Sequence, residues 1–593
     1  MGSQRSVNRR FGFFILFTLG LVGLLGIRLV DFQVVQAAEI KEKSMERRSV
    51  TQTLTALRGE IQDSAGQILA RTVFRYDVNV APKNVAPVIR YSEDGTRTEV
   101  PVEQIAIELA KLLGLTVSEI APKLVGDSQY ANLAKRVDAE TYSAIRELKV
   151  PWIYFDRFAD RLYPNGAVAG NLIGFVGADG EPLAGLERQY NTCLAGVDGQ
   201  ETYERSAEGV RIPASSVMTQ PIQNGGNLKL TIDSNLQFFA QQVLADSVND
   251  LSADWASAVV MEAKTGKIIV AAEAPSVDPN DPSASKAQDR GSRIFQSAFE
   301  PGSVMKALTV AMVLDTGTAN EKDKVKAPYS LKLDFPGGSV QDSFGHETYY
   351  LTLGGVLRYS SNTATVQFGR QIDKNVRYEY LKKFGFGKQT ALRFEGESSG
   401  ILHPADEWDK MTNYATMFGQ GISVTGIQMA AAYQAIANGG VKLDPVLVEG
   451  CALEDGTVTM KPKQTSTRVL SAAKAKNTLE LMEKVVEFGG VGKNAAIPGY
   501  RVGGKTGTAQ VQQGSGYGSR FAISFYGVAP IEDPQYIVGV TIYRPVGESN
   551  SMKTTPVFKA IMQQVLKHYR VPPSTTKSRD IPSGSFGEVE KRN

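Results

Sequence analysis

The chain has 593 residues, with 65 Lys and Arg against 62 Asp and Glu, and a formal net charge of +3 at pH 7. This balance of charge excludes a chain-wide electrostatic attraction to nucleic acid or to an acidic partner. The length exceeds what one hydrophobic core supports, and it predicts about two to four domains of roughly 150 residues each.

An apolar segment near the N-terminus is the first predicted element. Residues 11–27 carry no charged side chain, and three arginines precede them. A run of about 17 to 25 apolar residues can cross a bilayer, and arginines before it favour a cytoplasmic N-terminus. We expect residues 1–10 to be cytoplasmic, residues 11–35 to form a single transmembrane anchor in the cell membrane, and the bulk of the chain to be extracytoplasmic.

A cleaved signal peptide is the alternative reading of this segment. Gln36-Ala37-Ala38 offers a conceivable cleavage site, although Arg28 and Asp31 lie between it and the apolar run. Signal-peptide cores are usually about 7 to 15 residues long, which is shorter than this one. We favour the uncleaved anchor, and because no later segment has comparable apolar length we expect one crossing.

Residues 36–225 have a mixed character. Residues 63–66 predict a turn between two short extended runs, and helical periodicity follows over 102–115 and 140–150. The stretch 161–200 is rich in glycine and is predicted to be irregular. No nucleophile and base stand together here, so we expect a structural or docking domain, a pedestal.

Residues 226–570 predict a large unit of mixed helices and strands. Alternating apolar runs and short glycine-containing loops towards its end favour antiparallel neighbouring strands, with a helix closing the unit. The predicted strands are 228–232, two within 256–274, and 500–512, 520–530 and 535–545; the predicted helices include 234–248 and 557–569. The remaining residues, 571–593, are predicted to be a disordered tail.

Cysteine and histidine are scarce. Cys193 and Cys451 lie far apart in sequence and in different predicted domains. An oxidising compartment permits a disulfide, but a lone pair of cysteines is more often two separate buried or free thiols. With three histidines and no close Cys/His spacing, the sequence predicts neither a metal site nor a cofactor.

The pattern S-x-x-K is the first catalytic signal, and it occurs four times. On a helix, positions i and i+3 share a face, so the lysine can serve as a base for the serine. The pattern begins at Ser283, Ser303, Ser471 and Ser574. Ser574 lies in the proline-rich tail, Ser471 has the position of a helix N-cap, and Ser283 has no apolar pattern around it.

Ser303 differs because a nearly all-round apolar helix follows it as far as Gly317. Such a helix is buried, so Lys306 is expected in a low-dielectric environment where its charged form is disfavoured and its amine can act as a base. A helix capped by serine, with a lysine reaching to solvent, fits this motif alone equally well. The order of further motifs therefore decides.

Two further short patterns follow Ser303 along the chain. Ser360-Ser361-Asn362 is an S-x-N pattern, and Lys505-Thr506-Gly507-Thr508 contains K-T-G. S-x-N also occurs at Ser6 and Ser247, and K-T-G occurs at Lys264, between two apolar runs where glycine suits a hairpin turn. With Ser303 first, Ser360 second and Lys505 third, the three patterns follow in order within one predicted unit, 57 and 145 residues apart.

This ordered set resembles the active sites of serine transpeptidases and β-lactamases. More narrowly, the chain is similar to the class B penicillin-binding proteins, and among them to division-type (FtsI-like) D,D-transpeptidases. The resemblance extends over nearly the whole chain, through "RGEIQDSAGQILA", "RLYP", "GLERQYNTCLAG", "PSVDPN" and "FGQGISVTGIQMAAAYQAIANGG". It implies an α+β or α/β fold: a single transmembrane helix, a mixed dimerisation-like pedestal, and a transpeptidase domain with a mainly antiparallel sheet flanked by helices.

The resemblance implies a role for each motif residue. Ser303 attacks the carbonyl between the terminal D-alanines of a peptidoglycan stem peptide, and Lys306 takes its proton. Ser360 passes a proton to the leaving amine, and Asn362 orients Lys306 and binds the substrate amide. Lys505 supplies positive potential. Thr506, Gly507 and Thr508 bind the substrate, and the backbone N–H groups of Ser303 and Thr508 form the oxyanion hole.

Partners are likewise implied by the resemblance: stem peptides ending in D-Ala-D-Ala, β-lactams as covalent inhibitors, a polytopic SEDS-type glycosyltransferase and other division proteins. The same site also fits an elongation-type transpeptidase, a D,D-carboxypeptidase, a β-lactamase or a β-lactam sensor. A catalytically inactive, membrane-tethered scaffold is a further alternative. The long region before residue 226 and the single anchor favour the transpeptidase.

Three other side chains are weighed for a role at the site. His346 precedes Ser360 and is a conceivable rim residue, while Tyr517 and Arg520 follow the third motif and could contact substrate. For each of them a solvated loop without a role is the favoured interpretation.

Overall fold

The computed structural model describes residues 3–91, 95–206, 211–513 and 516–586. The chain forms two compact units, Met1–Leu57 with Ala195–Gly225, and Arg58–Leu194 with Gly226–Asn593. Of the two boundaries predicted for the pedestal, residue 225 coincides with the end of the first unit, whereas residue 36 lies inside that unit. Strand pairing joins the two ends of that segment to the first unit, whereas its middle belongs to the second.

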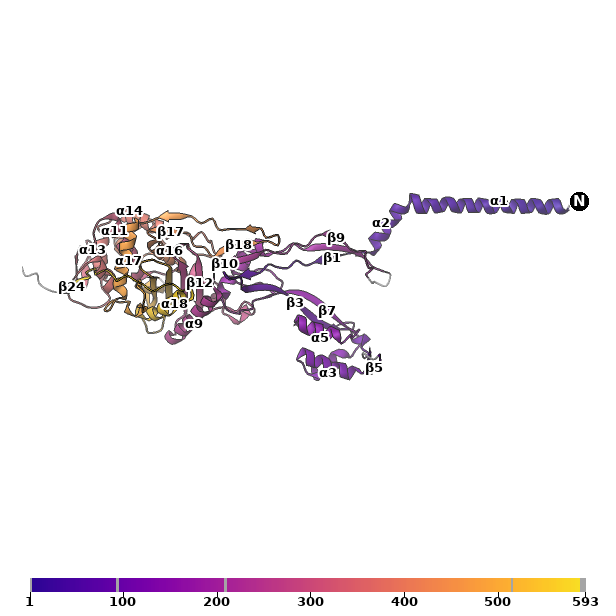
Figure 1. The fold of residues 1–593 in the computed structure, drawn as a ribbon, viewed down its shortest axis with the longest axis horizontal. Helices are drawn as coiled ribbons and strands as arrows, with labels where there is room; N and C mark the ends of the chain where they lie inside the picture. Colours follow the sequence, from indigo (N-terminus) through magenta and orange to yellow (C-terminus); the bar gives the residue numbers. More distant parts are fainter. Residues whose placement is uncertain (1–2, 92–94, 207–210, 514–515, 587–593) are drawn as a thin grey trace, which may run out of the picture. The chain divides into compact units, whose positions relative to one another are not determined.

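The first unit consists of helices and a small sheet. The elements of this unit are α1 (Ser3–Val30), the π-helical turn η1 (Asp31–Val35), α2 (Ala37–Arg48), β1 (Ser49–Leu54), β8 (Gly199–Glu204) and β9 (Val217–Gln220). Helix α1 is drawn as one continuous coil at the N-terminus (Figure 1). The strands pair antiparallel in the order β1-β8-β9.

The helical stretch Arg9–Val35 contains an 18-residue window with a mean hydropathy of 2.3, and no residue of that window is buried. Its length and composition suit a membrane span, and among the described residues it is the one helix that meets this criterion. The predicted apolar helix is therefore present as a possible anchor.

A seven-stranded sheet in the second unit has the order β19-β18-β10-β2-β3-β6, with β7 also paired to β3. Its strands are β2 (Ile61–Gln62), β3 (Ile68–Val80), β6 (Ala131–Val137), β7 (Ile153–Leu162), β10 (Asn227–Leu230), β18 (Val448–Ala452) and β19 (Val458–Thr459). Ile61 on β2 pairs in parallel with Leu228 on β10, and both side chains are fully buried. The predicted pedestal and transpeptidase segments thus share one sheet.

Two predicted helices pack on the pedestal strands. Helix α3 (Val102–Leu113) ends at Gly114, which has φ +66°, and α5 (Ala139–Glu147) begins where Asp138 accepts a hydrogen bond from Thr141 N at 2.8 Å. Both helices contribute to a small core with β3 and β6. Periodicity over 102–115 and 140–150 predicted these helices to within a few residues of each boundary.

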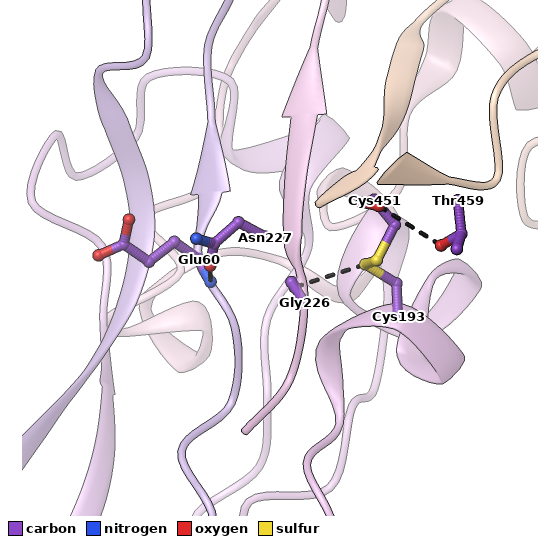
Figure 2. The surroundings of a disulfide bond; sticks show 6 residues. All are labelled: Glu60, Cys193, Gly226, Asn227, Cys451 and Thr459. Atoms are coloured by element: carbon purple, nitrogen blue, oxygen red, sulfur yellow. Dashed lines mark hydrogen bonds between the residues drawn. A yellow bond between two sulfur atoms is a disulfide. The ribbon is translucent and has the colours of Figure 1, made fainter. Parts of the chain in front are cut away.

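A disulfide joins Cys193, in α8 (Asn191–Leu194), to Cys451, in β18, and it corrects our prediction of separate thiols (Figure 2). The two Cα atoms lie 6.0 Å apart although 258 positions separate them in sequence. Sequence spacing could not show this because sheet pairing between distant segments brings the cysteines together. Gly226 lies against the bond, and a Cβ there would come 2.6 Å from Cys451 Sγ.

The other large sheet has the order β12-β11-β23-β22-β21, and every neighbouring pair is antiparallel, as predicted. Its strands are β11 (Trp255–Glu262), β12 (Ile268–Ala274), β21 (Gly503–Gln513), β22 (Gly516–Ala529) and β23 (Tyr536–Tyr543). Strand β21, which carries the third motif, is an edge strand. One of its two edges is therefore free of sheet pairing.

Helices cover both faces of this sheet. Tyr526 packs against Tyr433 of α16 (Gly426–Ala437), with ring centroids 5.5 Å apart, and Phe525 packs against Phe558 of α18 (Thr554–His568) at 4.6 Å. Consecutive strand residues point to opposite faces, so α16 and α18 lie on opposite sides. Helix α9 (Ser234–Leu251) contacts α18 and β12.

Further helices and several small sheets complete the second unit. Four longer helices are α11 (Met305–Thr316), α13 (Asn362–Gly369), α14 (Lys374–Phe384) and α17 (Ala472–Val486); the shorter ones are α4 (Val117–Ile120), α6 (Gly170–Ile173), α7 (Gly185–Gln189), α10 (Arg293–Gln296), α12 (Leu353–Tyr359) and α15 (Thr412–Ala415). Small two- and three-stranded sheets are formed by β4 (Val88–Tyr91), β5 (Arg97–Val100), β13 (Val325–Ala327), β14 (Ser330–Lys332), β15 (Ser339–Gln341), β16 (Tyr349–Leu351), β17 (Val441–Leu443), β20 (Ser466–Arg468) and β24 (Gly584–Phe586).

The C-terminal segment is ordered as far as Phe586, which corrects the predicted disorder from residue 571; residues 587–593 lie outside the described part. Strand β24 pairs antiparallel with β16, and Thr352 Oγ1 donates a hydrogen bond to Pro582 O. Ser574 Oγ accepts a hydrogen bond from Arg501 N at 2.8 Å. The polar, proline-rich composition gave no sign of these backbone partners.

Candidate active site

Ser303 lies in a tight turn at the start of a buried helix. The turn is the 3₁₀ segment Gly302–Val304, and α11 follows it directly. Gly302 has φ +58°, and a Cβ on it would meet Thr508 O at 2.4 Å. Because only glycine fits this conformation and this close approach, the turn can lie against strand β21.

Lys306 is fully buried, as the apolar helix predicted. Its Nζ donates to Ser360 O and, at 3.2 Å, to Ser360 Oγ. Burial lowers the pKa of Lys306 to about 7, and the Asp342 carboxylate opposes this to a smaller extent. A neutral amine one helical turn after Ser303 has the protonation state that a general base requires.

Ser360 lies between two buried lysines. It ends α12 in the left-handed region, at φ +57°, which is rare for a residue other than glycine and recurs at functional sites. Its Oγ accepts a hydrogen bond from Lys505 Nζ at 2.9 Å as well as the bond from Lys306. The S-x-N and K-T-G motifs therefore meet the S-x-x-K motif at one hydroxyl.

Asn362 is held by a different contact from the one expected. It begins α13, and its Nδ2 donates to Gln341 O at 2.8 Å. Within the described residues its side chain makes no hydrogen bond to Lys306, whereas Ser360 O and Oγ both accept from Lys306 Nζ. The orienting role that we expect of Asn362 stays a prediction. Both Asn362 and Ser303 line the same cavity.

Asp342 is a functional-site residue that the sequence analysis missed. Its Oδ2 accepts Ser361 Oγ at 2.7 Å and lies 3.0 Å from His346 Nε2, while Oδ1 accepts the backbone N–H groups of Asn362 and Thr363. A carboxylate at a helix N-terminus satisfies free N–H groups and interacts favourably with the helix dipole. Asp342 therefore fixes the start of α13, where the second motif lies.

His346 is part of this support rather than a solvated loop residue. Besides Asp342, it contacts Tyr349, with the two rings stacked at 4.1 Å between centroids. Its side chain is 3% exposed. In the sequence, the contact between Asp342 and His346 is indicated only by their spacing of four residues, and such spacings are common.

Lys505, of the third motif, is fully buried at the point where the three motifs meet. Its Nζ donates to Thr506 O at 3.0 Å and Thr506 Oγ1 at 3.1 Å, in addition to Ser360 Oγ. Burial, and then the nearby charge of Lys306, lower the pKa of Lys505 well below its usual value. A bound carboxylate would counter both effects, so the positive potential expected of Lys505 is strongest when an anion is present.

Gly507 of the third motif, and Gly503 and Gly504 before it, pack closely against other parts of the protein. A Cβ on Gly507 would meet Ser524 Oγ at 2.4 Å and Pro301 O at 2.8 Å, and Gly503 and Gly504 lie equally close to neighbouring protein atoms. In the direction that a Cβ would take, the space at these positions is filled by protein. Gly507 therefore allows the turn that carries Ser303 to pack on β21, and its role as a substrate contact stays a prediction.

Thr508 faces the serine turn along the free edge of β21. Its carbonyl oxygen approaches Gly302, and in a strand the N–H and C=O of one residue point to the same side. The Thr508 N–H therefore points to the Ser303 side, as an oxyanion donor must. Thr508 Oγ1 donates to Ser549 O at 3.3 Å.

A cavity of about 580 Å³ opens over these groups. The predicted site residues that line it are Ser303, Ser360, Asn362, Thr506 and Thr508, and Tyr359, Phe418 and Phe521 add aromatic surface. Among the residues that the structure describes, no group of three His, Cys, Asp or Glu side chains is placed to hold a metal ion. The cavity thus holds a serine and further hydroxyls, one of which, Ser360 Oγ, accepts hydrogen bonds from two buried lysines. Such a set of groups suits acyl transfer.

The other copies of the motifs lack this environment. Lys286 and Lys577 are exposed and Lys474 is half-buried, so none of the other S-x-x-K patterns holds a buried amine. The second K-T-G forms the turn between β11 and β12, with Gly266 at φ +70°, as predicted. The side chains of Ser6 and Asn8 lie outside the described set.

Tyr517 and Arg520 belong to strand β22 and not to a solvated loop. Tyr517 OH donates to Glu300 Oε1 at 3.0 Å, and Arg520 donates to Arg544 O and lies 3.5 Å from Asp254. The loop-like composition after the third motif did not predict these strand residues. Strands β21 and β22 form a long hairpin that extends past the third motif.

The lowered pKa of Lys306 predicts how acylation depends on pH. Below a pKa of about 7 the amine holds a proton and cannot accept the one on Ser303; above it the amine is free. We expect the second-order rate constant for acylation by a penicillin to rise as the pH is raised through about 7 and then to level off. A rate profile measured from about pH 5 to about pH 9 tests this, and a flat profile would argue against Lys306 as the base.

Comparison with known proteins identifies the two parts of the chain. Residues 256–563 match the family model for the penicillin binding protein transpeptidase domain, and residues 53–230 match the penicillin-binding protein dimerisation domain. These matches correspond to the transpeptidase and pedestal segments described above.

Three similar proteins support the match over most of the chain. Penicillin-binding protein PbpB of Mycolicibacterium smegmatis is 32% identical over 581 residues, covering 93% of this chain and 89% of its own length. Peptidoglycan D,D-transpeptidase FtsI of Escherichia coli is 29% identical, with coverages of 95% and 92%. Penicillin binding protein 3 of Mycobacterium tuberculosis, solved in complex with aztreonam, has a TM-score of 0.69 and 26% identity, with coverages of 90% and 100%. The chain belongs to the penicillin-binding protein transpeptidase family, in its class B, division-type branch.

Proposed function

We propose that this protein is a peptidoglycan D,D-transpeptidase that cross-links stem peptides through an acyl-enzyme on Ser303. The observation that carries the proposal is the convergence of buried Lys306 and Lys505 on Ser360 Oγ, in the cavity that Ser303 lines. Each of the three motifs supplies one of these groups. The site therefore has a base, a proton relay and a cationic anchor around one nucleophile.

The acylation step uses these groups in order. Ser303 Oγ forms a bond to the carbonyl carbon between the terminal D-alanines, and its proton passes to Lys306 Nζ. The oxyanion is held by the backbone N–H groups of Ser303 and Thr508; loss of one such donor costs about 10² to 10³ in rate. The C–N bond then breaks, the leaving amine takes a proton through Ser360, and D-alanine departs.

Deacylation completes the cross-link. An amine from a neighbouring stem peptide attacks the ester on Ser303 and loses its proton to the Lys306–Ser360 pair, and the serine oxygen recovers a proton as it leaves. The hydroxyls of Thr506 and Thr508, with Lys505, hold the terminal carboxylate of the donor before acylation. β-Lactams acylate Ser303 because they present a reactive amide in the place of the D-alanyl bond.

The cellular setting extends this proposal. The apolar helix over Arg9–Val35 anchors the chain in the cell membrane with the N-terminus cytoplasmic, and the transpeptidase part is extracytoplasmic. The enzyme acts in septal wall synthesis together with a SEDS-type glycosyltransferase and other division proteins. The division-type relatives favour this setting over side-wall elongation.

Product analysis tests transpeptidation against hydrolysis. The detergent-solubilised full chain is incubated with a pentapeptide donor ending in D-Ala-D-Ala and an isotope-labelled D-amino acid as acceptor. We expect labelled peptide to form with wild type and no product with Ser303→Ala. Exclusive formation of the tetrapeptide acid would identify a D,D-carboxypeptidase, and failure of wild type to bind a fluorescent penicillin covalently would identify an inactive scaffold.

A further inference from the structure

A basic cavity lies at the end of helix α14, and it shares no lining residue with the catalytic cavity. Its volume is about 350 Å³, and four lysines line it: Lys382, Lys383, Lys388 and Lys442. A neighbouring cavity of about 240 Å³ shares Lys388 and Lys442 and adds Arg393. The two cavities therefore meet at a pair of lysines.

Carboxylates compensate only part of this positive charge. Glu379 Oε1 lies 3.1 Å from Lys382 Nζ, and Asp444 Oδ1 lies 3.5 Å from Lys442 Nζ. The other basic side chains of the two cavities form no ion pair within the part of the chain that the structure describes: Lys383, Lys388 and Arg393. The cavities thus carry an excess of cations.

Two of these lysines have a local explanation. Lys382 and Lys383 lie in the last turn of α14, where cations interact favourably with the negative end of the helix dipole. Lys388 follows the end of the helix, and Lys442 is the central residue of strand β17. The helix dipole therefore does not account for the lysine pair that the two cavities share.

Lys442 is unusual because its residue is only 8% exposed. Its contact with Asp444, at 3.5 Å, is too long for a strong hydrogen bond, and Asp444 Oδ2 already accepts one from Thr465 Oγ1 at 2.5 Å. Burial lowers the pKa of Lys442, Asp444 opposes this, and the charge of Lys388 lowers it further. An anion between the two lysines would replace this repulsion with attraction.

The composition of the cavity indicates which anion it suits. Lysine ammoniums act as point charges that bind phosphate oxygens well, whereas a carboxylate is matched better by the planar fork of arginine. A phosphate monoester carries close to two negative charges at about pH 7, one for each lysine of the pair. Tyr378, Phe386 and Leu402 line the same cavity and offer apolar surface to an organic group.

We propose that the cavity at Lys388 and Lys442 binds an organic phosphate monoester. The two ammoniums hold the phosphate oxygens, and the organic group lies against Tyr378 and Phe386. This site is separate from the catalytic cavity, so the inference goes beyond the proposed function and does not depend on it.

Three small aromatic anions test the proposal. Phenyl phosphate is a dianionic monoester, methyl phenyl phosphate is the matching monoanionic diester, and benzoate is a carboxylate. The dissociation constant of each is measured on the detergent-solubilised full chain from the NMR relaxation of the probe's ring protons, with detergent alone as the blank. Sodium chloride holds the ionic strength constant, because salt screens weak attraction to surface charges.

We expect phenyl phosphate to bind wild type about tenfold more tightly than either monoanion, because it gains a second charged contact. Lys388→Gln and Lys442→Met should each weaken its binding about tenfold, since each removes one ammonium. Lys476→Gln, which alters an exposed lysine on α17, should leave the affinity unchanged. Labelling by a fluorescent penicillin checks that every variant is folded.

Other outcomes overturn the inference. Equal affinity for the three probes, or unchanged affinity for phenyl phosphate in folded Lys388→Gln, would remove the site. Tighter binding of the diester would assign the cavity to a phosphodiester, such as a lipid headgroup, and would contradict a monoester ligand. If Lys442→Met failed to fold, Lys388→Gln would decide, because Lys388 is exposed and its replacement disturbs no buried contact.

Discussion

Replacing Lys306 with methionine should lower the rate constant for acylation of Ser303 by a penicillin about 10²- to 10⁴-fold, the usual contribution of a positioned general base. Lys306 is the buried amine beside the nucleophile, and its pKa of about 7 leaves it able to accept a proton. Methionine preserves an unbranched apolar stem in the same volume but cannot accept the proton. The time course of penicillin labelling, followed by intact mass, measures the effect.

Two comparisons make this result specific. Lys474→Met alters the lysine of another S-x-x-K pattern and should leave the rate unchanged. The thermal midpoint of Lys306→Met should not fall, because burying the lysine amine costs free energy and an apolar side chain in its place removes that cost. Retention of near wild-type acylation by a folded Lys306→Met protein would place the base elsewhere.

Removing the disulfide with Cys193→Ser and Cys451→Ser should destabilise the second unit by about 4 kcal/mol. The bond spans 258 sequence positions, so its loss greatly enlarges the conformational freedom of the unfolded chain. Both cysteines are buried, and two hydroxyls in their place are poorly accommodated. Because the second unit is large and its unfolding entropy correspondingly high, we expect the thermal midpoint to fall by roughly 4 °C.

A reductant provides the control for this prediction. Wild type with an added thiol reductant should approach the midpoint of the double variant, whereas the double variant should not respond to the reductant. Equal midpoints for wild type and the double variant under oxidising conditions would show that the bond contributes little. Penicillin labelling at a temperature below both midpoints should remain near wild type, because neither cysteine lines the catalytic cavity.

Local sequence patterns predicted most of the elements that hold the active site. The apolar helix after Ser303 and the alternating strands that end at Tyr543 appear close to the predicted positions. Their side-chain periodicity reflects burial on one face or on all faces, and that information is local. The order of three motifs then selected Ser303, Ser360 and Lys505, and the structure brings these three together with Lys306.

What escaped prediction depends on contacts between distant residues. Asp342 supports the second motif across a loop, and Cys193 meets Cys451 through sheet pairing. The sequence could not show that Pro301 O lies against Gly507 in the direction that a Cβ would take. The C-terminal strand was missed for the same reason, since its polar residues form backbone pairs with β16 and leave no apolar signature.

The free edge of β21 constrains how this enzyme can change under drug selection. A peptide along that edge is held through main-chain N–H and C=O groups, which every residue type shares. A compound that copies the peptide backbone meets the same groups, and a substitution on the strand that rejects the mimic also rejects the substrate. We therefore expect resistant variants to alter the side-chain cavities beside β21, where substrate and inhibitor differ in shape and charge.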